Sequence, residues 1–117
     1  MSQSLSRLYV HIIFHTRNSR VLIRPEDTIR LYSYIGSIIK DNGSTPVSIN
    51  GTNDHVHILC ILSKNVCLAV LIEEIKRHSS RWIKTLDPHY KKFFWQGGDA
   101  GFSVSPSLVQ KTKMYID

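Results

Sequence analysis

The chain passes repeatedly between two kinds of segment. Four stretches rich in β-branched and aromatic side chains predict strands, at residues 8–16, 47–49, 55–62 and 102–104. Three longer stretches with apolar side chains at helical spacing predict helices, at residues 25–41, 66–84 and 106–115. The predicted order is strand, helix, strand, strand, helix, strand, helix, which indicates an α+β fold.

The first six of these elements follow the β-α-β-β-α-β order of the ferredoxin-like plan. We therefore expect an antiparallel sheet with two helices on one face, followed by a C-terminal helix that carries Tyr115. With 117 residues the chain has the size of one domain, so residues 1–117 are expected to form a single domain. This length excludes two-domain dehydrogenases and eight-stranded α/β barrels.

The balance of charges favours an anionic partner. Lysine and arginine total 15 against 9 acidic residues, a formal net charge of +6 with neutral histidines. A small domain this basic is attracted to nucleic acid or to an acidic membrane surface, although the charge can also serve solubility alone. No apolar run approaches the roughly 18 residues that a membrane span needs, so we expect no membrane partner.

The cysteines and the N-terminal residues indicate the cellular compartment. Cys60 and Cys67 form neither a disulfide framework nor a zinc-type spacing with the histidines. Residues 1–7 are polar and lack the apolar core of a secretory leader. A reducing, cytoplasmic setting is the expectation.

The triplet His55-Val56-His57 begins a predicted strand. Residues i and i+2 of a strand point to the same face about 6.6 Å apart, so two imidazoles can converge there on one metal ion. Asp54, just before them, could orient an imidazole or close the preceding loop. Taken alone, the triplet is more simply interpreted as two surface histidines. Leu59, the next residue on this face, argues against a histidine-triad nucleotide hydrolase, whose strand alternates three histidines.

Tyr115 is the candidate nucleophile on the last predicted helix, on one face with Leu108 and Thr112. A tyrosine hydroxyl, with an ordinary pKa of about 10, is a weak nucleophile, but a metal-polarised phosphate can make its attack feasible. In isolation the residue would be interpreted as a core tyrosine.

The stretch from Lys76 to Trp95 interleaves cations with aromatic rings, and only Asp87 opposes the positive charge. Cations that follow phosphates and rings that stack on bases suit single-stranded nucleic acid. The plain alternative is a solvated helix face beside core aromatic residues. The candidate DNA contacts are the basic residues Arg17, Lys76, Arg77, Arg81 and Lys84.

Five motifs occur in a characteristic order along nearly the whole chain. They are V-H-I-I-F-H-T-R at 10–17, G-T-N-D-H-V-H-I-L at 51–59, I-K-R-H-S-S at 75–80, F-W-Q at 94–96 with G-F-S-V-S at 101–105, and Y-I at 115–116. Together they resemble the small single-strand DNA transposases of insertion sequences, a class that includes the REP-associated tyrosine transposases. The second motif is similar to that family's His-hydrophobe-His (HUH) signature, and the last to its catalytic Tyr-Ile.

The resemblance implies a function and the residues for it. His55 and His57 would bind a divalent ion, Mg²⁺ or Mn²⁺, and Tyr115 would attack the scissile phosphate, forming a 5′-phosphotyrosine link and freeing a 3′-hydroxyl. Family members act as homodimers, in which the tyrosine helix of one subunit commonly serves the histidines of the other. We therefore expect a metal-dependent tyrosine transposase that cleaves and rejoins single-stranded DNA at hairpin-flanked transposon ends.

Two departures from the family pattern leave an alternative open. A Gln or Asn usually follows the tyrosine by four residues as a third metal ligand, which here would be position 119, beyond Asp117. The Gly-Tyr-Gly that usually follows the Trp-Gln reads Gly98-Asp99-Ala100. The alternative is a catalytically impaired or truncated single-stranded nucleic-acid-binding module of the same fold. A metal-dependent phosphohydrolase of small substrates and a noncatalytic structural protein are further alternatives.

Overall fold

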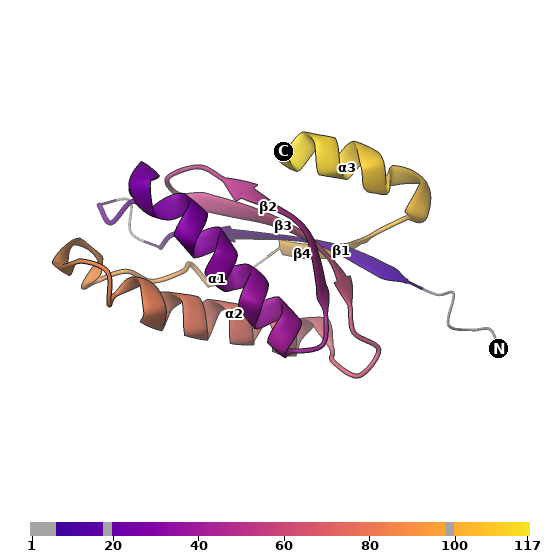
Figure 1. The fold of residues 1–117 in the computed structure, drawn as a ribbon, viewed down its shortest axis with the longest axis horizontal. Coiled ribbons are helices and arrows are strands. Elements are labelled where there is room, and N and C mark those ends of the chain that lie inside the picture. The colour runs from indigo at the N-terminus through magenta and orange to yellow at the C-terminus, as the bar shows by residue number, and fades with distance from the viewer. Residues whose placement is uncertain (1–6, 18–19, 98–99) are drawn as a thin grey trace.

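A computed structural model describes residues 7–17, 20–97 and 100–117, and its elements follow the predicted order (Figure 1). The strands are β1 (Leu8–His15), β2 (Thr45–Gly51), β3 (His55–Leu62) and β4 (Ala100–Val104). The helices are α1 (Thr28–Asp41), α2 (Leu68–Ile83) and α3 (Val109–Ile116). Short 3-10 turns lie at Pro25–Asp27, Pro88–Tyr90 and Pro106–Leu108. Gly98 and Asp99, where the sequence departs from the family pattern, lie outside the described residues.

The four strands form one antiparallel sheet in the order β2-β3-β1-β4. β1 and β3 occupy the centre and pair along their whole length, from Leu8 opposite Leu62 to His15 opposite His55. The predicted α+β architecture, with an antiparallel sheet and a C-terminal helix, is confirmed. The central pair carries four of the six histidines.

The helices α1 and α2 lie on one face of the sheet and bury the main core beneath them (Figure 1). From the strands, alternate residues of β1 and β3 point into this core and are almost fully buried, as the period of two predicts. From α1 and α2, buried residues recur at helical spacing. The core side chains are Val10, Ile12, Phe14, Val56, Ile58, Cys60, Leu31, Ile35, Ile39, Leu71 and Ile75.

The other face of the sheet carries α3 (Figure 1). A second, smaller apolar cluster lies under this helix, formed by Leu59, Val104 and Ile116. The odd-numbered residues of β1 and β3, including all four histidines of these strands, belong to this face. α3 therefore covers part of the same surface on which the histidines lie.

The hairpin between β2 and β3 differs from the sequence expectation. The strand predicted at residues 47–49 is longer, since β2 continues through Gly51, which pairs with Val56 even though Asn-Gly is a dipeptide typical of turns. The turn is instead formed by residues 52–54. A side chain at Gly51 would place its Cβ only 2.1 Å from the His55 carbonyl oxygen, so glycine is required here by close backbone approach.

None of the helices in the described part of the chain is both long enough and apolar enough to cross a membrane.

Candidate active site and nucleic-acid interface

β3 presents His55 and His57 on the face that α3 covers. Their ring centroids are 5.1 Å apart and the ring planes are nearly perpendicular, at 81°. Burial lowers the pKa of His57 below its ordinary value of 6.5, and the neighbouring histidines His11, His55 and His15 lower it further. His57 is therefore neutral near pH 7 and keeps a nitrogen lone pair for binding.

The loop before β3 holds the ring of His55. Asp54 Oδ1 lies 2.8 Å from His55 Nδ1, and Thr52 Oγ1 lies 2.9 Å from the same nitrogen. Thr52 also donates a hydrogen bond of 2.9 Å to Asp54 Oδ1. The hydrogen bond with His55 is the main cause of a lowered pKa at Asp54. Asp54 thus does both things considered from the sequence: it contacts the imidazole and it closes the loop.

His11 on β1 is a neighbour of the site that the sequence did not single out. Its Nε2 lies 3.0 Å from Nδ1 of His57, and burial lowers its pKa. Two positions further along the same face of β1, the His15 ring lies 5.4 Å from the His55 ring. The spacing of His11 and His15 places both side chains on one face of β1. That this face also carries His55 and His57 follows only from the register of β1 against β3.

Tyr115 lies on α3, above these histidines. Its ring centroid is 5.6 Å from that of His57 and 6.4 Å from that of His11, in edge-on arrangements. The residue is 72% exposed, so its hydroxyl is accessible to a large substrate rather than buried in the core. Tyr115 and the two candidate ligands are thus brought together within one chain, and the expected sharing of this site between subunits stays a prediction.

Two polar side chains of β2 hold the end of α3 against the sheet. Asn50 donates a hydrogen bond of 3.0 Å to the carbonyl oxygen of Ile116, and Ser48 donates one to the carboxylate of Asp117. The last turn of α3 is further closed by an ion pair between Lys113 and Asp117. These contacts place Tyr115, in the same turn, beside the histidines.

The donor set of His55 and His57 fits a divalent ion that takes its other ligands from elsewhere. Both rings use Nδ1 in a hydrogen bond, and neither Nε2 atom is hydrogen bonded within the described residues. In residues 7–17, 20–97 and 100–117 no three His, Cys, Asp or Glu side chains are grouped to hold a metal. Mg²⁺ commonly combines few protein ligands with water and phosphate oxygens, so two imidazoles are compatible with such an ion although weak alone.

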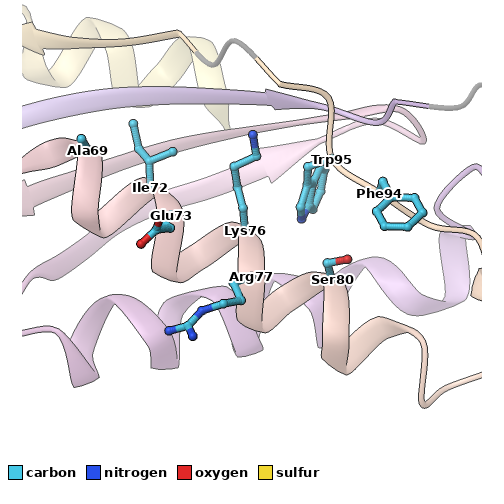
Figure 2. A pocket seen from close by; sticks show the side chains of 8 residues that line it. All are labelled: Ala69, Ile72, Glu73, Lys76, Arg77, Ser80, Phe94 and Trp95. Carbon is cyan, nitrogen blue, oxygen red and sulfur yellow. The ribbon is translucent and has the colours of Figure 1, made fainter.

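A groove of about 440 Å³ runs along α2, on the helix side of the molecule. Its lining combines charged, polar and aromatic side chains: Ala69, Ile72, Glu73, Lys76, Arg77, Ser80, Phe94 and Trp95. Figure 2 shows Lys76 pointing from α2 toward the segment that carries Phe94 and Trp95, whereas Arg77 points away from it. Phe94 is 51% exposed, and Lys84 Nζ lies 4.3 Å from its ring centroid.

Of the candidate DNA contacts, some border the segment 94–96 and others lie on α2 away from it. Lys76 Nζ donates to the Gln96 carbonyl at 2.8 Å, and the Arg17 amide donates to the Phe94 carbonyl at 2.8 Å, so both residues border the segment 94–96. Arg77 is paired with Glu74, one turn back on α2. Arg81 is exposed on the same helix and forms no ion pair with the described residues.

The end of β1 connects the groove with the histidine site. The carbonyl of His15 accepts a hydrogen bond of 2.7 Å from the amide of Gln96, beside the groove. The side chain of His15 lies on the other face, next to His55. His15 therefore contacts the segment 94–96 through its backbone and His55 through its side chain.

The whole chain is similar to known transposases. A family model described as "Transposase IS200 like" matches residues 4–117. A solved "putative transposase" from Deinococcus radiodurans R1 superposes with a TM-score of 0.77 at 20% identity, covering 99% of this chain and 93% of the other. A REP-associated tyrosine transposase bound to a REP hairpin superposes with a TM-score of 0.68 at 16% identity, covering 99% and 70%. At these identities the structural likeness concerns the fold. No curated protein sequence matches the chain.

Proposed function

Because the chain belongs to the IS200-like transposase family, we propose that it breaks and rejoins single-stranded DNA with Tyr115 as the nucleophile. The observation that carries this proposal is the position of Tyr115, exposed and 5.6 Å from the ring of His57. An accessible hydroxyl next to two metal-capable imidazoles is the arrangement that phosphoryl transfer to tyrosine requires.

The reaction exchanges one phosphodiester bond for another. The Tyr115 oxygen forms a bond to phosphorus, the bond from phosphorus to the 3′-oxygen breaks, and the phenol proton is lost while the 3′-oxygen gains one. The product is a 5′-phosphotyrosine and a free 3′-hydroxyl. A later attack by a 3′-hydroxyl on this link restores a phosphodiester and frees Tyr115, so rejoining needs no ATP.

His55 and His57 are the residues proposed to hold Mg²⁺ or Mn²⁺. When bound, the ion would supply a Lewis acid for the phosphate oxygens. Asp54 and Thr52 orient the His55 ring, and the β2 side chains Asn50 and Ser48 keep α3 in place over the sheet. The protein thereby holds its nucleophile in position before DNA binds, which lowers the entropic cost of the attack.

We further propose that the DNA is a hairpin with an unpaired flank, held by the basic groove along α2. Exposed Phe94, with Lys84 against its ring, offers a surface for stacking a base beside a cation for phosphate. One structurally similar transposase is bound to a REP hairpin, which supports this choice of substrate. The homodimer expected from the family is part of the proposal.

The experiment is a covalent-capture assay with the full chain. A labelled single-stranded hairpin is incubated with Mg²⁺ or Mn²⁺, and the protein is separated on a denaturing gel. A labelled adduct is expected for wild type, and its loss is expected for Tyr115→Phe. Tyr34→Phe is the matched control, since Tyr34 stacks on Trp82 away from the site, and this variant should retain the adduct.

A second function is favoured by one observation, the small donor set at the site. No three His, Cys, Asp or Glu side chains are grouped to hold a metal in the described residues, so a binding module that holds DNA without cutting it is the alternative. It is supported if wild type binds the hairpin but yields no adduct in either metal. An adduct that survives Tyr115→Phe would instead show that another residue is the nucleophile.

A further inference from the structure

His11 is a buried histidine in the middle of the central strand β1. Only 6% of the residue is exposed, and β3 and β4 cover the two edges of its strand. A buried polar ring is unfavourable unless it is hydrogen bonded. The neighbouring cluster of Leu59, Val104 and Ile116 shows that this face of the sheet also accepts apolar side chains. A histidine at this position therefore calls for an explanation beyond packing.

The hydrogen bond between His11 and His57 supplies an explanation for the buried histidine. His11 Nε2 lies 3.0 Å from His57 Nδ1, with the ring centroids 5.2 Å apart and the planes tilted by 32°. A neutral imidazole has one N–H and one bare nitrogen, so this contact must join a donor to an acceptor. When His57 Nδ1 is the donor and His11 Nε2 the acceptor, the bare nitrogen of His57 is Nε2.

We propose that His11 is a positioning residue that keeps His57 in the Nδ1–H tautomer and fixes its ring, so that His57 Nε2 stays available to a divalent ion. The inference rests on the proposed function, because it assigns His11 a task at the same site. Hydrogen bonds of this kind to a ligand's second nitrogen commonly change metal affinity by about 10- to 100-fold.

The other candidate ligand has an equivalent partner. Asp54 contacts His55 Nδ1 at 2.8 Å and leaves His55 Nε2 available in the same way. Asp54 precedes His55 directly in the chain, whereas His11 reaches His57 from another strand. Their backbones are not paired, since His57 is opposite Ile13 and His11 is opposite Leu59. Both ligands are thus oriented through Nδ1, one by a carboxylate and one by a neutral ring.

The test uses three variants of the full chain without DNA. His11→Leu removes the acceptor, while His11→Gln keeps an acceptor oxygen at a similar reach. His78→Gln is the control, since His78 lies on α2 and pairs there with Glu74. The first measurement is Mn²⁺ binding by calorimetry. The second is the tautomer of His57 in the metal-free protein, read from long-range ¹H–¹⁵N correlations at mildly alkaline pH.

The expected wild-type result is hydrogen on His57 Nδ1. His11→Leu should weaken Mn²⁺ binding about 10- to 100-fold and shift His57 toward the Nε2–H tautomer. His11→Gln and His78→Gln should keep the wild-type tautomer and affinity. The proposal is overturned if wild-type His57 carries its hydrogen on Nε2, or if folded His11→Leu binds Mn²⁺ as wild type does.

These measurements are independent of the proposed cleavage. Should His11→Leu not fold, the wild-type tautomer still decides the question, because hydrogen on His57 Nε2 overturns the proposal. A wild type without covalent adduct but with the expected tautomer and Mn²⁺ binding would refute the transposase reaction and leave the role of His11 intact. The reverse result would refute the role of His11 alone.

Discussion

Trp95 donates its indole N–H to the hydroxyl of Ser79 on α2, at 2.9 Å and in a fully buried position. Ser79 in turn donates to the carbonyl of Ile75 at 2.6 Å. Two of the motifs that carry the family resemblance, at 75–80 and 94–96, therefore meet in the core. Their shared contact fixes the segment 94–96 against α2 and so shapes the groove proposed for DNA.

Replacing Ser79 should destabilise the fold. Ser79→Ala leaves the Trp95 N–H buried without an acceptor, which costs about 1–3 kcal/mol in the free energy of unfolding. Ser80→Ala is the matched control, because Ser80 is partly exposed and its contact with the Phe93 carbonyl is long, at 3.5 Å. Urea denaturation followed by circular dichroism measures both. Equal losses for the two variants would contradict the role assigned to Ser79.

The sequence predicted best those features that depend on local period. The alternation of β3 places Val56, Ile58 and Cys60 in the core and leaves His55 and His57 on the other face, as expected from the pattern alone. The same holds for the buried face of α1. The side-chain period of a strand or helix is set by its own backbone geometry. The buried face can therefore be predicted without knowing which element packs against it.

What failed, or was missed, depends on pairing between distant segments. Asn50-Gly51 is a dipeptide typical of turns, yet its pairing with β3 overrides that preference. His11 acquires its contact with His57 only through the β1–β3 register, across 46 residues of chain. The approach of Tyr115 to His57 was expected from the family resemblance and not from any local pattern, because it arises from helix-to-sheet packing.

Asn50 should control how firmly α3 is held. Asn50→Ala removes the hydrogen bond to the Ile116 carbonyl, worth about 0.5–1.5 kcal/mol, and should speed amide exchange in α3 roughly 2- to 13-fold. Covalent adduct formation should fall with it, because Tyr115 spends less time beside the histidines. Asn42→Ala is the control, since Asn42 bonds the Ile38 carbonyl at the end of α1 and should affect that helix instead. Unchanged amide exchange in α3 would show that the Asn50 hydrogen bond does not hold this helix.

Arg81 should contribute to DNA affinity through charge. It is exposed on α2 and forms no ion pair with the described residues, so it can neutralise a phosphate without losing an existing partner. Arg81→Ala should lower the slope of log affinity against log salt by about 1, with similar loss for different sequences. The control is Lys40→Ala, an exposed cation at the end of α1, which should leave the slope unchanged. Fluorescence anisotropy with a labelled hairpin at several salt concentrations measures it, and equal slopes for Arg81→Ala and wild type would exclude the contact.

Tyr90 links stability to pH at the far side of the core. It is fully buried, donates to Asp27 Oδ2 at 2.5 Å and accepts from the Arg24 amide at 2.9 Å. Burial, and then the hydrogen bond to Asp27, raise the pKa of Tyr90 from 10.0 to about 12. Above about pH 10 the unfolded chain loses this proton while the folded chain keeps it, so stability falls as pH rises.

Tyr90→Phe isolates this effect. Near neutral pH the variant should be less stable by about 1–3 kcal/mol, because buried Asp27 loses its donor. The stabilisation from the Tyr90 hydroxyl is fully present below about pH 10 and disappears as pH rises through about 12, so the difference from wild type should narrow over that range. Urea denaturation of both proteins at neutral pH and at about pH 11 measures the difference, in which the other titrating groups cancel. Ile83→Val, a buried change without a titrating group, should keep a constant difference, and a constant difference for Tyr90→Phe would contradict the assignment.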